Sequence, residues 1–194
     1  MAITHPVSGD LGCKVVYYGP AASGKTTNLK YVYGRLDPKA RGKLIAPKDG
    51  PERTLFLDFL AVDMGVVQGI RTRFHLCTVP GQAPQRESRR LVLRGVDGVV
   101  FVADSHPQRM AANRESLSDL EANLGDAGLE ITDVPMVIQY NKRDLDGATP
   151  IDELEKQLNP LGHPMFEAVA ITGPGVLESL TAISRQIIKS LNRA

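Results

Sequence analysis

The sequence predicts an α/β fold of three layers, in which a mostly parallel six-stranded sheet with one antiparallel edge strand lies between helices on both faces. Two observations support this prediction. Strand-like and helix-like stretches alternate along the whole chain, and the run at 98–103 (GVVFVA) is apolar on both faces, as buried parallel strands are. Ligands bind such sheets beyond the carboxyl ends of the strands, so functional residues are expected directly after each strand.

Composition narrows the class of protein. The chain has 194 residues, 42% of them apolar, which fits one folded domain expected to span residues 1–194. A net charge of +1 predicts no nucleic-acid partner. Apolar stretches such as 99–103 are far shorter than the about 20 residues that cross a bilayer, and the first residues do not resemble a secretion signal. Cys13 and Cys77 lie in strand-like runs without CxxC spacing, which indicates reduced core thiols of a cytoplasmic protein.

Glycine and proline divide the chain up to Val79 into five segments. They are a strand at 13–18, a helix at 26–35, a long loop at 37–53 and strands at 54–62 and 69–79. A turn around 63–65 is expected to join the last two strands into an antiparallel hairpin. Long loops in compact domains are usually functional, so 37–53 is a candidate functional segment.

The rest of the chain alternates between helix and strand. The expected elements are a basic helix at 84–94, a strand at 98–103, a helix at 107–124, a strand at 134–140, a helix at 151–158, a strand at 166–170 and a helix at 176–191. The last helix has one stripe of apolar residues, with which it can cover a face of the sheet.

The first candidate site is the loop between the first strand and the first helix, Gly19-Pro-Ala-Ala-Ser-Gly24-Lys25-Thr26, which matches G-x-x-x-x-G-K-[ST]. Backbone N–H groups of such a loop, and of the start of the helix, curl around phosphate oxygens where side chains would obstruct them. Lys25 would place a charge on the β- and γ-phosphates, and Thr26 would offer a hydroxyl oxygen to Mg²⁺. The expected nucleotide-binding residues of this segment are Gly19, Ala22, Ser23, Gly24, Lys25, Thr26 and Thr27.

The second candidate site, Asn141-Lys142-Arg143-Asp144, directly follows the predicted strand at 134–140. The carboxylate of Asp144 can accept hydrogen bonds from the ring N–H and the exocyclic amine of guanine, whereas adenine would leave it buried and unpaired. Such a site can reject the wrong base by roughly 10⁴–10⁵. Lys142 would cover the ring, and Asn141 would connect the segment to the phosphate loop. Alone, this tetrapeptide also fits a solvated charged turn, but its place after this strand favours guanine recognition.

The motifs and their surroundings resemble the Ras-like small GTPases, which have a P-loop NTPase fold. The resemblance lies in KVVYYGP…SGKTTNLK, ERTLFLDFL, TRFHL-TVPGQ, LRGVDGVVFVADS, VIQYNKRDL and EAVAITGPGV. Within that superfamily, the chain is similar to the MglA-like group of bacterial gliding-motility and cell-polarity GTPases. The resemblance implies a GTP/GDP switch that binds Mg²⁺, hydrolyses GTP slowly without a partner, and works in the cytoplasm with recruitment to a cell pole.

The resemblance also assigns roles that spacing alone does not. Thr54 matches the threonine that contacts Mg²⁺ and the γ-phosphate in the GTP state, and Gly81 matches the glycine whose N–H senses that phosphate. Gln82 matches the residue that orients the attacking water, and Arg53 matches an arginine finger supplied by the protein itself. Without the resemblance, Arg53 would be interpreted as a solvated loop charge and Gln82 as a polar turn residue. The segment whose backbone touches the guanine oxygen corresponds to Val169, Ala170 and Ile171.

The chain departs from the Ras-like pattern at three places. Thr78 stands where most Ras-like proteins have an aspartate that holds a Mg²⁺-bound water, although the MglA-like group also has threonine there. Because a hydroxyl carries no charge, weaker Mg²⁺ retention is expected. Asp58 is a candidate to supply the missing carboxylate. Ala21 replaces a common glycine close to the expected γ-phosphate, and misplacement by about 1 Å can cost about 10²-fold in rate, so slow intrinsic hydrolysis is expected. Residues 83–85 (APQ) replace a stretch that is bulkier and more apolar in relatives. This stretch belongs to the second of the two switch regions, which change conformation with the bound nucleotide, so the preference for partner proteins is expected to differ from that of relatives.

Partners follow from the resemblance rather than from the motifs. It implies stimulation by a Roadblock-fold homodimer (MglB-like), effectors that recognise the switch regions within 37–94, and a shift of the strand at 54–62 along its neighbour between nucleotide states. A cluster of arginines on the helix at 84–94 fits either a solvated face with local salt links or a patch for acidic effectors or a membrane surface. Its members are Arg86, Arg89, Arg90 and Arg94.

Two other functions fit part of the sequence. A nucleotide-locked scaffold that hydrolyses GTP poorly would agree with Ala21 and the altered second switch. A P-loop kinase for small metabolites would explain the phosphate loop but leaves the segment at 141–144 without a role. A preference for guanine over adenine nucleotides would separate the kinase from the first two.

Overall fold

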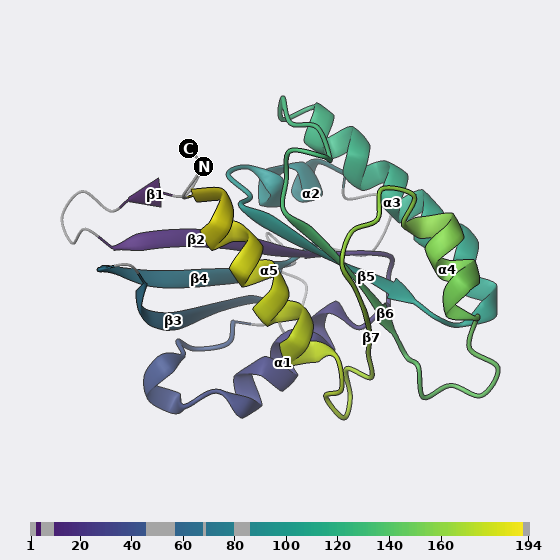
Figure 1. Cartoon of the computed structure of the whole chain (residues 1–194), viewed down its shortest axis with the longest axis horizontal. Coiled ribbons are helices and arrows are strands. Elements are labelled where there is room, and N and C mark those ends of the chain that lie inside the picture. Colours follow the sequence, from purple (N-terminus) through teal and green to yellow (C-terminus); the bar gives the residue numbers. More distant parts are fainter. Residues whose placement is uncertain (1–2, 5–9, 46–56, 68, 80–85, 192–194) are drawn as a thin grey trace, which may run out of the picture.

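The computed structural model describes residues 3–4, 10–45, 57–67, 69–79 and 86–191. In this part of the chain the predicted architecture is confirmed, because one sheet lies between two layers of helices (Figure 1). Among these residues, no helix is both long and apolar enough to cross a membrane.

The main path of the sheet has six strands in the order β3-β4-β2-β5-β6-β7. Their bounds are β2 Leu11–Tyr18, β3 Phe59–Val67, β4 Ile70–Thr78, β5 Gly98–Asp104, β6 Met136–Asn141 and β7 Met165–Glu167. All neighbours along this path are parallel except β3 and β4, as the sequence predicts. A seventh strand, β1 (Ile3–Thr4), pairs antiparallel with the start of β2. Two residues show no periodicity, so the sequence did not predict β1.

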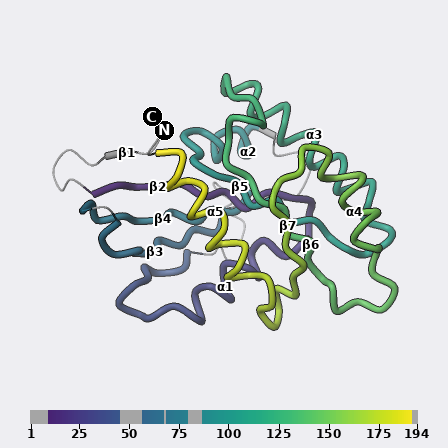
Figure 2. The backbone as a smooth tube through the Cα atoms, viewed as in Figure 1, coloured from purple at the N-terminus to yellow at the C-terminus, as the bar shows by residue number. Residues whose placement is uncertain are grey.

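The helices lie on both faces of this sheet (Figures 1 and 2). Their bounds are α1 Lys25–Arg35, α2 Arg86–Leu93, α3 Met110–Gly125, α4 Ile151–Leu158 and α5 Val176–Leu191. One face is covered by α1 and α5, and the other by α2, α3 and α4. Two 3₁₀ turns, η1 (Pro38–Ala40) and η3 (Pro107–Arg109), take up parts of the predicted loop and of the predicted third helix.

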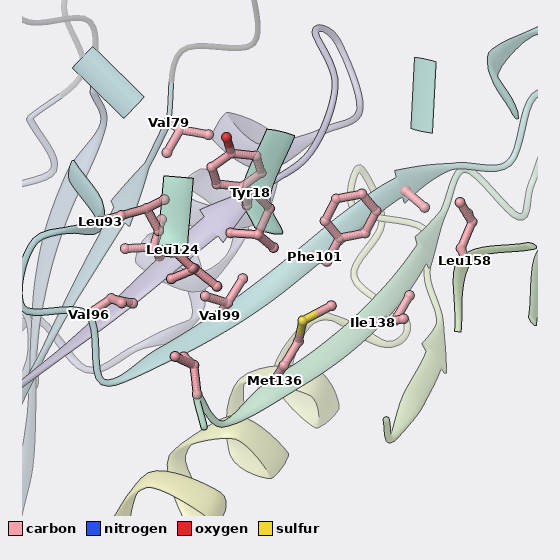
Figure 3. Close-up of a cluster of buried hydrophobic side chains, with 14 of the residues drawn as sticks. Tyr18, Val79, Leu93, Val96, Val99, Phe101, Leu124, Met136, Ile138 and Leu158 are labelled. Atoms are coloured by element: carbon pink, nitrogen blue, oxygen red, sulfur yellow. The ribbon is translucent and has the colours of Figure 1, made fainter. Parts of the chain in front are cut away.

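Alternate residues of β2 pack on opposite faces and build two cores. Val16 and Tyr18 belong to the core under α2, α3 and α4, whereas Val15 and Tyr17 belong to the core under α1 and α5. Figure 3 shows the first core, in which Tyr18 and strand residues of β5 and β6 meet leucines of the covering helices. All seven residues of β5 and all six of β6 are buried, which fits their mostly apolar sequences; the polar exceptions are Asp104, Gln139 and Asn141. Cys13 and Cys77 are buried free thiols, as predicted.

The predicted hairpin between β3 and β4 exists, but the predicted turn at 63–65 is wrong. β3 continues to Val67, and its pairing with β4 shifts between Asp63 and Val66, which marks a β-bulge. Gly65 has a left-handed backbone (φ 73°), and the side chain of Asp63 accepts the N–H of Gly65 at 2.8 Å. Asp and Gly favour turns and bulges for the same conformational reason, so the sequence did not separate the two.

Other predicted boundaries shift by a few residues. β3 begins at Phe59, so residues 57 and 58 of the predicted strand do not belong to it, and residues 54–56 lie outside the described part. β7 ends at Glu167 and not at 170. Of the predicted loop at 37–53, the described part runs to Ile45 and pairs with β3 at two isolated bridges, Arg41 with Val62 and Ile45 with Phe59. The bounds of α4 and α5 agree with the prediction.

Candidate functional site

The carboxyl ends of β2, β5 and β6 bring the two predicted motifs together. β2 ends at Tyr18 and α1 begins at Lys25, so the glycine-rich loop lies between them. Gly19 has a φ of 142°, and a Cβ there would lie 2.2 Å from the carbonyl oxygen of Val102 on β5. Gly24 has a φ of 106°, and its Cβ would lie 2.1 Å from Nδ2 of Asn141. Both positions therefore require glycine, because the loop lies directly against its neighbours.

Lys25 is buried with its ammonium group inside this loop. Its Nζ donates to the carbonyl oxygens of Gly19 at 2.8 Å and Pro20 at 2.7 Å. Burial, with a smaller contribution from the positive charge of Arg89, lowers the pKa of Lys25 to about 7, while Asp58 opposes the shift. A buried cation with few negative neighbours gains from an anion beside it, which fits a phosphate.

Thr26 faces a carboxylate on the neighbouring segment before β3. Its Oγ1 donates to Oδ2 of Asp58, a residue that is 6% exposed. Thr78, the last residue of β4, fixes Asp58 in two ways: its hydroxyl accepts the N–H of Asp58 at 2.9 Å and donates to Oδ2 at 3.1 Å. The threonine at position 78 therefore places a carboxylate from position 58 beside Thr26.

Asn141 connects the second motif to the first. Its Nδ2 donates to the carbonyl oxygen of Ser23 at 2.7 Å, and its Oδ1 accepts the N–H of Ala170 at 2.8 Å. One buried side chain thus joins the phosphate loop, the end of β6 and the segment after β7. Lys142 follows with a left-handed backbone (φ 68°), and its Nζ lies 2.6 Å from Oδ2 of Asp104. A non-glycine residue at positive φ is uncommon and frequently marks a functional site.

These residues surround a cavity of about 250 Å³. Its lining consists of Ala22, Gly24, Thr27, Asn141, Lys142, Asp144, Leu145, Ala170 and Ile171. The cavity combines apolar walls with a carboxylate from Asp144, which is the environment that an aromatic ring with N–H donors requires. Leu145 is a wall residue that the sequence did not predict; its apolar character directly after Asp144 was the available indication.

Several predicted site residues lie outside the described part of the chain. They are Arg53, Thr54, Gly81 and Gln82. Ser23 and Val169 are described but do not line the cavity; Ser23 contributes its carbonyl to Asn141, and the carbonyl of Val169 accepts the N–H of Gly173 at 2.7 Å.

The predicted arginine cluster on α2 does not form one solvated face. The side chain of Arg89 is only 10% exposed, and its Nη1 lies 2.5 Å from Oδ2 of Asp119 on α3. The same Oδ2 accepts the hydroxyl of Tyr18, the last residue before the phosphate loop. Arg90, by contrast, is half exposed and lies 3.8 Å from Asp126. Arg89 therefore links α2 to α3, and its side chain is not available to a docking patch on α2.

A loop of this geometry after the first central strand, beside a cavity with an acidic edge, defines a P-loop nucleotide-binding protein. Comparison with known proteins gives the family. The sequence pattern of the ADP-ribosylation factor family matches residues 59–187. The mutual gliding-motility protein MglA of Myxococcus xanthus (strain DK1622) is 48% identical over 193 residues, which cover 100% of this chain and 99% of that protein. Human ADP-ribosylation factor-like protein 4A is 31% identical over 123 residues, which cover 60% of this chain and 59% of that protein.

The chain belongs to the ADP-ribosylation factor family of Ras-like small GTPases. It is therefore a guanine-nucleotide-binding protein that hydrolyses GTP, and the resemblance drawn from its motifs is confirmed at this level.

Proposed function

We propose that residues 1–194 form a single GTPase domain that switches between GTP and GDP states to control cell polarity or gliding motility in a bacterium. Identity of 48% over the whole chain with a protein named for gliding motility supports the cellular role. The observation that carries the chemical part is the contact of Asn141 with both the phosphate loop and Ala170, because it holds the proposed phosphate and base sites at a fixed separation.

In this proposal the phosphates bind to Lys25 and to the backbone N–H groups of the loop and the start of α1, within residues 21–27. The helix dipole of α1 also favours the negative charge of the phosphates, because α1 begins at Lys25, where the loop ends. Asp144 accepts hydrogen bonds from the edge of guanine, Lys142 covers the ring, and the backbone of residues 169–171 meets the guanine oxygen. The cavity beside Gly24 and Ala170 is the place for the base.

We further propose that Mg²⁺ is held by Thr26, with Thr54 as an additional ligand in the GTP state. The donor set fits, because the hydroxyl of Thr26 and the carboxylate of Asp58 are hard oxygen ligands in contact with each other. Mg²⁺ supplies positive charge that neutralises the phosphates during transfer. Asp58, positioned by Thr78, would provide the carboxylate that Ras-like proteins outside the MglA-like group carry at position 78.

Hydrolysis is proposed to depend on Gln82 and Arg53, as the family resemblance implies. Gln82 would orient the attacking water, and Arg53 would stabilise the charge that develops on the γ-phosphate, an effect worth about 10³–10⁵ in rate. Thr54 and Gly81 would hold the switch segments only while the γ-phosphate is present, so hydrolysis would release both segments.

The partners and the location of the switch are proposed from the same resemblance. A Roadblock-fold homodimer of the MglB-like kind would stimulate hydrolysis, and effectors would bind the switch segments. The protein would work in the cytoplasm and be recruited to a cell pole. Phosphate release measured with and without such a homodimer tests the switch; no stimulation would favour a nucleotide-locked scaffold.

The decisive experiment compares the wild type with Asp144→Asn. Losing two hydrogen bonds to a carboxylate should weaken GDP binding by about 10² or more, whereas xanthosine diphosphate, with an oxygen in place of the guanine amine, should bind the variant better than the wild type. If Asp144→Asn binds xanthosine diphosphate better than the wild type does, the variant is also shown to be folded. Equal affinity of the wild type for guanine and adenine nucleotides would overturn the proposal.

A further inference from the structure

Arg109 lies outside every motif of the sequence, yet its side chain reaches the phosphate loop. It is the last residue of η3, after β5, and its Nη2 donates to the carbonyl oxygen of Ala21 at 2.6 Å. Its side chain is 35% exposed, so the guanidinium lies at the rim of the loop. A charge-assisted hydrogen bond across the site from an unassigned residue suggests a role in binding.

Asp104 holds Arg109 in this position. Its side chain is 1% exposed, and Oδ2 lies 3.5 Å from Nε of Arg109 and 2.6 Å from Nζ of Lys142. The side chain of Asn113 on α3 forms hydrogen bonds of 2.9 Å with both backbone groups of Asp104, which fixes the end of β5. The buried carboxylate of Asp104 therefore links Arg109, at the phosphate loop, with Lys142, which lines the cavity.

The peptide that Arg109 contacts has a disfavoured conformation. Ala22 has a φ of 60°, in the left-handed region that a residue with a Cβ rarely adopts. In a trans peptide the C=O and N–H groups point in opposite directions. Because Arg109 binds the C=O of Ala21, it directs the N–H of Ala22 away from itself and holds the peptide in this orientation.

The neighbouring carbonyls of the loop are also held by cations or amides. Lys25 binds those of Gly19 and Pro20, and Asn141 binds that of Ser23. Held by these donors, the carbonyl oxygens do not turn toward a bound phosphate, where their partial negative charge would be unfavourable. Fixing the carbonyls therefore prepares the N–H groups for an anion.

We propose that Arg109 is a positioning residue for the nucleotide β-phosphate. Anchored by Asp104, it keeps the peptide between Ala21 and Ala22 turned so that the N–H of Ala22 faces the phosphate. The inference rests on the proposed function, because that function places a guanosine diphosphate or triphosphate in this loop. The effect of Arg109 on nucleotide affinity should therefore be confined to nucleotides that carry a β-phosphate.

The test compares GDP with GMP in equilibrium titrations of the full chain. Arg109→Met removes the donors but keeps the length; it should weaken GDP binding about 10- to 100-fold and GMP binding by less than about threefold. Arg109→Lys retains a cationic donor and should recover part of the loss. Arg114→Met is the matched control, because Arg114 is exposed on α3 and its removal changes the net charge equally.

Two results would overturn the inference. Equal weakening of GDP and GMP by Arg109→Met would indicate a general structural effect, and unchanged GDP binding would show that the contact has no role. Both outcomes leave the guanine preference of the wild type intact. Loss of that preference in the wild type would instead overturn the proposed function.

Discussion

Asp58 is proposed to take over, in Mg²⁺ binding, the role of a residue at another position. Relatives outside the MglA-like group commonly carry the carboxylate at position 78, but here Thr78 uses its hydroxyl to hold Asp58 against Thr26. The carboxylate thus comes from the segment before β3 and not from the end of β4. A direct consequence is that Thr78 and Asp58 should act as one unit in Mg²⁺ binding.

Asp58→Asn should weaken Mg²⁺ binding to the GDP complex by about 10-fold or more, because an interaction with a charged group contributes about 1.5–3 kcal/mol. The measurement is the Mg²⁺ concentration that half-suppresses GDP release. Thr78→Val should have a smaller effect in the same direction, since Asp58 loses its support, whereas Thr78→Ser keeps the hydroxyl and should behave as wild type. An unaltered Mg²⁺ dependence of Asp58→Asn would contradict this role.

His163 should make stability depend on pH. Burial lowers its pKa below the usual value of 6.5, and its Nε2 is buried without a hydrogen-bond partner among the described residues. The unfolded chain therefore binds a proton more readily than the folded protein, so the stability present above pH 6.5 is lost as the pH falls through 6.5 toward the folded pKa.

Urea denaturation of the wild type and His163→Gln measures this contribution. Between neutral pH and about pH 5, the wild type should lose more unfolding free energy than the variant. Between pH 7.5 and 8.5 the two proteins should show the same dependence, because the imidazole is neutral in both states there. A parallel loss in both proteins at acid pH would assign the dependence to other groups.

At the scale of elements, the packing of α5 on the sheet depends on the absence of a side chain at Gly98. A Cβ at this first residue of β5 would lie 2.7 Å from Cδ1 of Ile187 and 3.0 Å from Cδ1 of Ile183. Both contacts are with α5, so this helix or its side chains must move to admit a methyl group.

Gly98→Ala should therefore destabilise the protein by about 1–3 kcal/mol, the usual cost of overpacking a core. Adding Ile187→Val, which removes the nearest methyl group, should recover part of the loss in chemical denaturation. Gly34→Ala is the control: Gly34 lies in α1 with no atom within 4 Å of its added Cβ, so alanine should stabilise the helix by about 0.5–1 kcal/mol. Similar effects at both glycines would refute the packing argument.

Local features of the sequence predicted most of the elements. Pro150 precedes α4, and Gly175, with a left-handed φ of 74°, precedes α5; such residues mark helix boundaries clearly, and both helices start where expected. The face of a helix that packs is harder to predict. Periodicity grouped Arg89 with its solvated neighbours, but the position of Asp119 on α3 decides that Arg89 is buried.

The phosphate loop and the segment at 141–144 were predicted from sequence because each is short and continuous. The contacts between them could not be predicted, since Arg109 and Ala21 are 88 positions apart and Asp104 and Lys142 are 38 apart. Such pairs meet only because β2, β5 and β6 are neighbours in the sheet. Strand order is a property of the whole fold, and no local pattern contains it.

At the scale of the whole molecule, the family resemblance predicts that β3 shifts along β4 between nucleotide states. The observed register pairs Leu60 with Leu76 and Ala61 with His75. Leu60 and Val62 are buried on alternate positions, and a shift by one residue would turn them to the other face. Any shift should therefore cover an even number of residues.

Cysteines introduced at Ala61 and His75 should form a cross-strand disulfide that fixes this register, because paired Cα atoms in such strands lie within disulfide range. The native thiols are buried, and burial raises the pKa of Cys13 to about 12, so they should not compete. The oxidised variant should bind GDP and a non-hydrolysable GTP analogue with affinities whose ratio differs at least about 10-fold from wild type, and reduction should restore the ratio. Identical ratios before and after reduction would exclude the shift.

β3 and β7, the two end strands of the main path of the sheet, also limit how other chains can pair with it. Arg41 and Ile45 already occupy part of the free side of β3, and β7 has only three residues. A foreign segment that tried to extend the sheet would find few backbone groups in a continuous row. Complexes of this protein should consequently form through side chains on helices and loops, and concentrated solutions should resist the growth of fibrils.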